Sequence, residues 1–320
     1  MDTAQRFRGF ADTEARGHSP VYERLARRVA SERRLLELID RLPEPKRQPN
    51  LLLAAARLLG GPIGDARAFP SWAIAEWERL SAVMLARLTQ TNEAGRCATL
   101  MPLLASLPQP LALIEVGASA GLCLFPDRYR YLYADRPAIG AGPVSLACRT
   151  SGPVPFPARP PVVAWRAGVD LNPLDVRDEA DMRWLECLIW PGQDERLARL
   201  RAAVGLARED PPRLVRGDLR DDLGEVLSDL VAQAPAGATP VIFHSAVLAY
   251  LPAAQRASFA AAVRDLPGHW ISNESPGVVP GVREALPWAA PAGRTVFALA
   301  LDGRPIAYTG PHGEHLDWFA

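Results

Sequence analysis

Residues 111–122, which read Leu-Ala-Leu-Ile-Glu-Val-Gly-Ala-Ser-Ala-Gly-Leu, constrain the fold of this chain more than any other stretch. A short apolar run that ends in an acid, is closed by glycines and leads into apolar residues predicts a parallel strand, a tight loop and the start of a helix. Gly117 suits the sharp turn, and Gly121 would let a helix or a ligand approach the main chain closely. A helix beginning there would direct free N–H groups at a ligand, so we expect a nucleotide-like ligand at this loop.

The loop is compatible with three interpretations. Glu115, Gly117 and Gly121 resemble motif I of class I S-adenosylmethionine-dependent methyltransferases, with Ser119 where that motif has its middle glycine. Residues 117–121 also resemble the G-x-S-x-G nucleophile elbow of α/β-hydrolases. The third interpretation is a structural strand, turn and helix without a ligand. The remainder of the chain has to distinguish between them.

Composition excludes several classes of protein. The 320 residues are 48% hydrophobic and carry a formal net charge of zero, which is typical of a globular protein and predicts neither a nucleic-acid nor a membrane partner. The first residues are polar, and the four cysteines form no C-x-x-C pair, so we expect a cytoplasmic protein with reduced thiols. His312 and His315 lack the cysteines or acids of a metal site, so we expect no metal. The oligomeric state stays open.

The chain predicts two domains. Residues 1–106 show helical periodicity only, for example where Ser19 precedes Pro20 as an N-cap. Residues 107–320 alternate strands with helices, which predicts an α/β domain with a parallel sheet. The expected strands are 111–115, 162–170, 213–218, 240–245 and 269–272, and 295–308 is expected to form a terminal antiparallel hairpin around Asp302-Gly303. A glycine- and proline-rich stretch at about 128–161 is expected to be an insertion.

Polar residues stand where the predicted parallel strands end, which is where ligands bind in open α/β sheets. Their order resembles that of a class I methyltransferase. The resemblance implies that Gly117, Ser119 and Gly121 lie under the methionine part of the cofactor, that Asp170 binds the ribose hydroxyls, and that Asp218 lies near the adenine. It also implies that His244 and Ser245 lie beside the methyl acceptor. The full set of expected cofactor-binding residues is Glu115, Gly117, Ser119, Gly121, Asp170, Asp218 and Ser245.

Nearly the whole chain is similar to the bacterial family known as domain of unknown function 2332. The stretches that carry this resemblance are Ser19-Pro-x-Tyr22, Gln90-Thr-Asn-Glu93 with Arg96, residues 115–122, Asp127-Arg-Tyr129, Arg166-x-Gly-x-Asp170 through Pro173-Leu-Asp175, Trp184-Leu185, Trp190-Pro191, His244-Ser245 and Pro311-His-Gly313. The resemblance implies that Gln90, Asn92, Glu93 and His312 face the site. It brings no known reaction.

The sequence therefore predicts an α/β fold with a class I methyltransferase-like (Rossmann-like) mixed sheet and a terminal antiparallel hairpin, preceded by an all-helical N-terminal domain. The predicted function is methyl transfer from S-adenosylmethionine to an unidentified small-molecule acceptor. His244 or Glu93 is the expected base, and Gln90, Asn92 and His312 are the expected acceptor contacts. Alternatives are a non-catalytic adenosyl-ligand-binding or regulatory protein and a serine hydrolase that uses Ser119. Asp302 and His312 follow Ser119 in the chain order of a hydrolase triad.

Overall fold

The computed structural model describes residues 2–134, 136–218, 220, 223–291 and 293–320. The chain divides into a helical unit, Met1–Thr91 with Arg177–Ala198, and an α/β unit, Asn92–Val176 with Arg199–Ala320. The division differs from the predicted boundary at residue 106. Helix α7 (Cys97–Ser106) belongs to the α/β unit, whereas α8 (Glu179–Leu188) belongs to the helical unit. Helix α9 (Asp194–Glu209) begins in the helical unit and continues into the α/β unit.

The helical unit is built from short amphipathic helices around an apolar core. Its further elements are α1 (Thr3–Gly9), the π-helical turn η1 (Phe10–Ala15), α2 (Pro20–Val29), α3 (Arg33–Ile39), the 3-10 turn η2 (Glu44–Lys46), α4 (Pro49–Leu58), α5 (Phe69–Ala75) and α6 (Trp77–Ala86). Ser19 caps α2 as predicted, since its hydroxyl accepts from the Tyr22 N–H. Helix α8 joins this core through the buried Trp184, whose Nε1–H donates to the Leu88 carbonyl at 2.9 Å.

The α/β unit contains a large mixed sheet whose described strands lie in the order β2-β3-β10-β9-β8-β7-β6-β1-β4-β5. The strands are β1 (Leu111–Val116), β2 (Arg130–Tyr133), β3 (Ser145–Ser151), β4 (Val163–Asp170), β5 (Arg213–Arg216), β6 (Thr239–Ser245), β7 (His269–Glu274), β8 (Phe297–Leu301), β9 (Arg304–Thr309) and β10 (His315–Trp318). Strands β5, β4, β1, β6 and β7 are parallel to one another. The strand order reverses between β1 and β6, because β4 and β5 lie on one side of β1 and the later strands β6 and β7 lie on the other.

The predicted parallel strands and the terminal hairpin are confirmed. Strands β8 and β9 pair antiparallel, and the turn between them has positive φ at Asp302 (51°) and Gly303 (81°), as a tight two-residue hairpin requires. The region expected to be an insertion contributes β2 and β3 to the sheet, which the sequence did not predict. Strand β10 was also not predicted, and it lies between β3 and β9.

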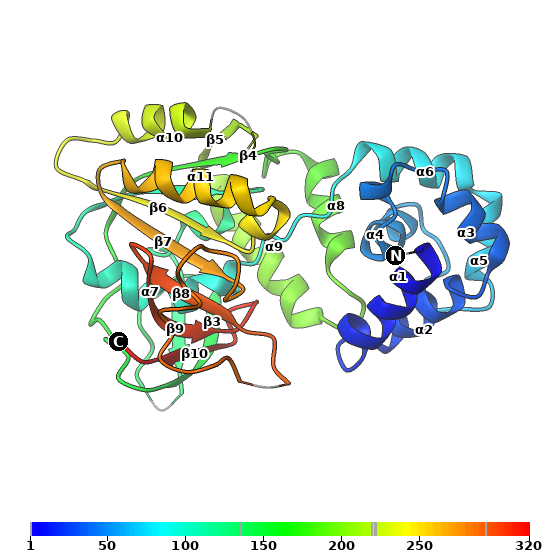
Figure 1. The fold of residues 1–320 in the computed structure, drawn as a ribbon, viewed down its shortest axis with the longest axis horizontal. Helices are drawn as coiled ribbons and strands as arrows, with labels where there is room; N and C mark the ends of the chain where they lie inside the picture. Colours follow the sequence, from blue (N-terminus) through cyan, green and yellow to red (C-terminus); the bar gives the residue numbers. More distant parts are fainter. Residues whose placement is uncertain (1, 135, 219, 221–222, 292) are drawn as a thin grey trace. The chain divides into compact units, whose positions relative to one another are not determined.

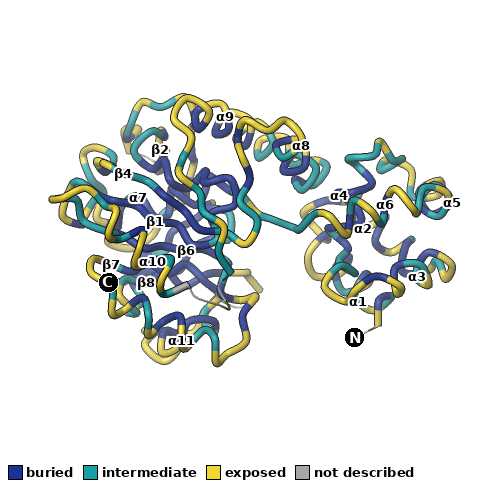
Figure 2. Tube along the Cα trace, turned by 90° about the horizontal axis from the view of Figure 1, so that it is seen from above, coloured by how far each residue is buried: buried dark blue, intermediate teal, exposed yellow. Residues whose placement is uncertain are grey.

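Helices α10 (Leu223–Ala232) and α11 (Ala253–Arg264) cover one face of the parallel strands (Figure 1). Ile114 and Val116 of β1 point to this face and pack with apolar residues of both helices, whereas Glu115 between them points to the opposite face. The central strands are buried along their length, and the outer side of α11 is exposed (Figure 2). Within the described residues, no helix combines the length and the apolar character that a membrane span would need.

Candidate functional site

The loop after β1 adopts a backbone conformation that depends on its glycines. Gly117 (φ 73°), Ser119 (φ 52°) and Gly121 (φ 72°) all lie in the left-handed region, which only glycine adopts without cost. A β-carbon on Gly117 would overlap with the side chain of Val247, which follows β6. The loops after β1 and β6 therefore pack directly on each other at the reversal of strand order.

The predicted helix after this loop is wrong. Residues Leu122–Leu124 form the 3-10 turn η4 instead, and Pro126 follows closely enough to stop an α-helix. Several N–H groups of the loop are donated within the protein. Those of Gly117 and Ala118 reach the Val169 carbonyl at 2.8 and 3.2 Å, and that of Gly121 reaches the Ala118 carbonyl at 2.6 Å. The expected helix N-terminus, with free N–H groups directed at a ligand, is therefore not what forms here.

Two polar side chains hold the loop in place. Asp170 at the end of β4 accepts from the Ser119 N–H at 2.8 Å and from the Asn172 N–H at 2.7 Å. Asn92 bridges the loop, because its Nδ2 donates to the Ala118 carbonyl at 3.0 Å and its Oδ1 accepts from the Leu122 N–H at 3.1 Å. Both residues lie at the loop, and these bonds fix its conformation.

Glu115 and Ser119 contribute buried polar atoms. Glu115 is 7% exposed and Ser119 is 3% exposed. Among the described residues, Glu115 Oε2 and Ser119 Oγ have no hydrogen-bond partner. Burial raises the pKa of Glu115 well above its usual range, the Cys123 thiol raises it further, and the Arg96 guanidinium lowers it in part. The raised pKa favours the protonated, neutral form of this carboxyl group. Buried polar atoms of this kind call for a water molecule or a ligand.

A polar network crosses the ends of β6, β7 and β9 on the Glu115 face. Arg96 donates to the Ser245 carbonyl at 2.8 Å and to the Pro311 carbonyl at 2.9 Å. Asn273 donates to Ser245 Oγ at 3.0 Å and accepts from Thr309 Oγ1 at 2.6 Å. Arg96, Asn273 and Thr309 were not predicted as site residues. The polar end of the strand 269–274 was the available signal for Asn273.

Glu93 is buried and ion-paired. Its Oε1 accepts from Arg199 Nε at 2.8 Å and from the Gly95 N–H at 3.0 Å, and the side chains of the pair are 5% and 21% exposed. This arrangement favours a structural ion pair over the predicted role as a base. The backbone of His312 also reaches this region, since a β-carbon on Gly95 would lie 2.5 Å from the His312 carbonyl oxygen. Gln90 belongs to the helical unit, and its role as an acceptor contact stays a prediction.

His244 lies on the opposite face of the sheet from Glu115, packed on Phe259 of α11 at 5.3 Å between ring centroids. Its Nε2 accepts from Trp270 Nε1 at 3.0 Å, so its Nδ1 carries the proton and donates to Glu274 Oε1 at 2.8 Å. Glu274 Oε1 also accepts from the N–H groups of Val247 and Leu248. Both ring nitrogens are thus occupied, which favours a structural role over the predicted role as a base.

Asp218 lies after β5 and pairs with Arg220 at 2.6 Å. The hydrogen bond from Arg220 lowers the pKa of Asp218. Its predicted contact with adenine stays a prediction.

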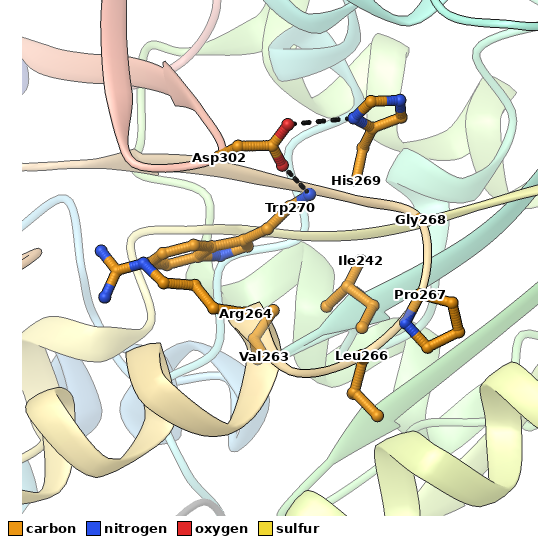
Figure 3. A pocket seen from close by; sticks show the side chains of 9 residues that line it. All are labelled: Ile242, Val263, Arg264, Leu266, Pro267, Gly268, His269, Trp270 and Asp302. Atoms are coloured by element: carbon orange, nitrogen blue, oxygen red, sulfur yellow. Dashed lines mark hydrogen bonds and ion pairs between the residues drawn. The ribbon is translucent and has the colours of Figure 1, made fainter.

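The residues of the hydrolase triad are not assembled. Asp302 lies at the amino end of β7, where it accepts from the Trp270 N–H at 2.8 Å and pairs with His269 at 3.0 Å (Figure 3). Ser119 follows the carboxyl end of β1. Because β1 and β7 run in the same direction, the side chains of Ser119 and Asp302 lie at opposite ends of the parallel strands. A pocket of about 150 Å³ adjoins Asp302, with Ile242, Val263 and Leu266 among its apolar lining.

Comparison with curated proteins and with solved structures found no match. A family model does match, over residues 4–318, which is nearly the whole chain. The chain belongs to the family described as "Uncharacterized protein conserved in bacteria (DUF2332)".

Proposed function

We propose that the α/β unit binds S-adenosylmethionine at the loop after β1 and transfers its methyl group to a small-molecule acceptor. The observation that carries this proposal is the position of the loop beside Asp170, at the carboxyl end of the neighbouring parallel strand β4. Strands β5, β4, β1, β6 and β7 follow the order of a doubly wound sheet, in which ligands bind where the order reverses. The loops after β1 and β6 meet at that reversal.

The antiparallel hairpin β8–β9 beyond β7 agrees with the class I methyltransferase-like, Rossmann-like fold that the sequence predicts. The loop is also suited to a ligand without phosphate groups. Its N–H groups at Gly117, Ala118 and Gly121 are donated within the protein, so the loop gives little support to a dinucleotide, whose pyrophosphate would need such groups.

Two further features support an adenosyl ligand with a charged amino-acid end. Glu115 Oε2 and Ser119 Oγ lack partners among the described residues. A hydroxyl can donate and accept, and a carboxyl group accepts and, in the protonated form that burial favours, also donates. The carboxylate of Asp170 favours a cationic sulfonium nearby. When bound, S-adenosylmethionine supplies an electrophilic methyl group. Because His244 and Glu93 are already bonded to other residues, the contribution of this chain is to bind and orient the acceptor.

The test is calorimetric binding of S-adenosylhomocysteine to the full chain, with NAD as the competing ligand class. We expect Asp170→Asn to weaken binding about ten- to hundred-fold, since one charge-assisted hydrogen bond contributes roughly 1.5–3 kcal/mol. Asp302→Asn is the matched control, because Asp302 also accepts a backbone N–H but lies at the amino end of the parallel strands instead of the carboxyl end. Equal affinity for both variants would remove Asp170 from the site, and no binding to the wild type would reject the proposal.

A second candidate is an adenosyl-ligand-binding protein without turnover. The observation that favours it is that both predicted bases, His244 and Glu93, are committed to internal partners. Incubation with S-adenosylmethionine and a mixture of small-molecule acceptors distinguishes the two. Formation of S-adenosylhomocysteine supports the enzyme, whereas binding without product supports the second candidate. Stoichiometric labelling of Ser119 by a fluorophosphonate would contradict both and favour a hydrolase.

A further inference from the structure

The chain passes between its two units at three places, after Thr91, after Val176 and after Ala198. At two of these crossings the first residues of the α/β unit are Asn92, Glu93 and Arg199. All three make specific polar contacts inside the α/β unit. These three residues therefore connect two of the crossings to the structure around the loop after β1.

The Asn92 side chain matches the two loop atoms that it bridges. The loop presents one acceptor, the Ala118 carbonyl, and one donor, the Leu122 N–H, and a carboxamide satisfies both at 3.0 and 3.1 Å. An aspartate could keep only the contact with the Leu122 N–H, and an apolar residue could keep neither. Ser119 and Gly121, with their left-handed backbone, lie between the two bridged residues.

Glu93 joins one crossing to another. Its carboxylate binds Arg199 in α9, and α9 runs without a break from the helical unit into the α/β unit. A continuous helix transmits a displacement of its first turn to the residues that follow. The ion pair is largely buried, with Glu93 only 5% exposed, so solvent screens it little.

We propose that Asn92 is a positioning residue for the loop after β1, and that Asn92 with the Glu93–Arg199 pair couples this loop to the chain crossings between the units. Binding at the loop then changes the conformational freedom of the crossings. Because such coupling is reciprocal, displacement of the crossings changes the affinity at the loop. The positioning role stands on the contacts alone. The coupling to a ligand rests on the proposed function.

Amide hydrogen exchange of the full chain tests the positioning role without any ligand. We expect the Leu122 amide to exchange about five-fold faster in Asn92→Ala, because one net hydrogen bond of about 1 kcal/mol is lost. Asn92→Asp keeps the acceptor and should retain near-wild-type exchange at Leu122. Gln109→Ala is the matched control, since its carboxamide also bridges backbone groups but at the amino end of β1. Unchanged Leu122 exchange in Asn92→Ala, or equal acceleration in Gln109→Ala, would overturn the role.

The coupling has two tests of its own. Without ligand, Glu93→Gln should accelerate Leu122 exchange several-fold, whereas Glu209→Gln, which removes another ion pair of α9, should not. With saturating S-adenosylhomocysteine, exchange in residues 194–198 should slow in the wild type and stay unchanged in Asn92→Ala. If the ligand binds and these amides do not respond, the coupling is wrong. If the ligand does not bind, the proposed function fails, while the ligand-free measurements still decide the positioning role and the link through Glu93.

Discussion

The two histidine–carboxylate pairs at the ends of β7 have the same chemistry in different surroundings. His244 donates to Glu274 at the carboxyl end, and His269 pairs with Asp302 at the amino end, with distances of 2.8 and 3.0 Å. Trp270 bonds to both pairs, through its side chain to His244 and through its backbone to Asp302. The side chains of the first pair are 0% and 1% exposed, whereas those of the second are 29% and 48% exposed.

The buried pair also makes more hydrogen bonds to neighbouring backbone groups than the exposed pair. Glu274 also accepts from the N–H groups of Val247 and Leu248, and Val247 packs on Gly117 of the candidate site. The buried pair therefore stabilises the loop after β6, and this loop packs on the loop after β1. The exposed pair holds only the start of β7 and the β8–β9 turn, and water can replace its contacts at small cost.

Removing the carboxylate of each pair in turn should give the largest difference in stability between the two pairs. Glu274→Ala leaves the His244 Nδ1–H and two backbone N–H groups without acceptors in a buried site, so we expect a loss of about 3–5 kcal/mol in the free energy of unfolding. Asp302→Ala exposes its partners to water and should cost about 1 kcal/mol or less. Urea titration of each variant gives both values. Similar losses would show that burial does not distinguish the pairs.

Replacing two glycines that have positive φ by alanine should give the next largest difference in stability. Gly303→Ala in the β8–β9 turn introduces a positive-φ alanine, which costs about 1–2 kcal/mol. Gly117→Ala adds the overlap with Val247, so we expect about 2–4 kcal/mol and weaker binding of S-adenosylhomocysteine. Thermal unfolding measures the stabilities. A smaller loss at Gly117 than at Gly303 would mean that the two site loops are not closely packed.

The burial of Glu115 should change how stability depends on pH, and we expect this effect to be smaller than those of the substitutions above. Its pKa is raised in the folded chain, mainly by burial, so the native state retains a proton that the unfolded chain releases above about 4.5. Glu115 therefore makes stability fall as pH rises from that value toward its folded pKa. Glu115→Gln should remove this fall, so that the variant gains stability over the wild type as pH rises above about 5. Urea midpoints of the two proteins that stay parallel as pH rises would contradict a raised pKa of Glu115.

The sequence was informative where the signal is local. Each parallel strand is an apolar run that ends at a polar residue, and such runs predict buried strands without knowledge of the remainder of the chain. The hairpin was equally clear, because a tight two-residue turn needs positive φ at both positions and Asp-Gly is a preferred pair for it, as Asp302 and Gly303 show. Strands β2 and β3 were missed because exposed and buried residues alternate along them, so neither is buried along its length as β1 is. Strand β10 reads His-Leu-Asp-Trp and has no two adjacent apolar residues.

The sequence was uninformative where the partner of a residue decides its role. The apolar stripe of α8 predicts a helix but does not show that Trp184 packs in the helical unit. His244 follows the motif of a site residue, yet its ring turns to the other face of the sheet, where Trp270 and Glu274 bind it. Asn92 and Asp170 lie at the loop, but only three-dimensional contacts show that they hold its backbone. A local signal did exist against the expected helix, because Pro126 follows the loop too closely for a helix to continue.

Strand β10 has a consequence for how the sheet is assembled. It is the last described strand along the chain, yet it lies between β3 and β9 and pairs with both. During synthesis β3 emerges long before its neighbour β10, so the inner edge of β3 stays unpaired until β10 arrives. An unpaired strand edge invites wrong pairing with another chain. We therefore expect the newly made chain to be most prone to aggregation just before residues 315–318 fold into the gap.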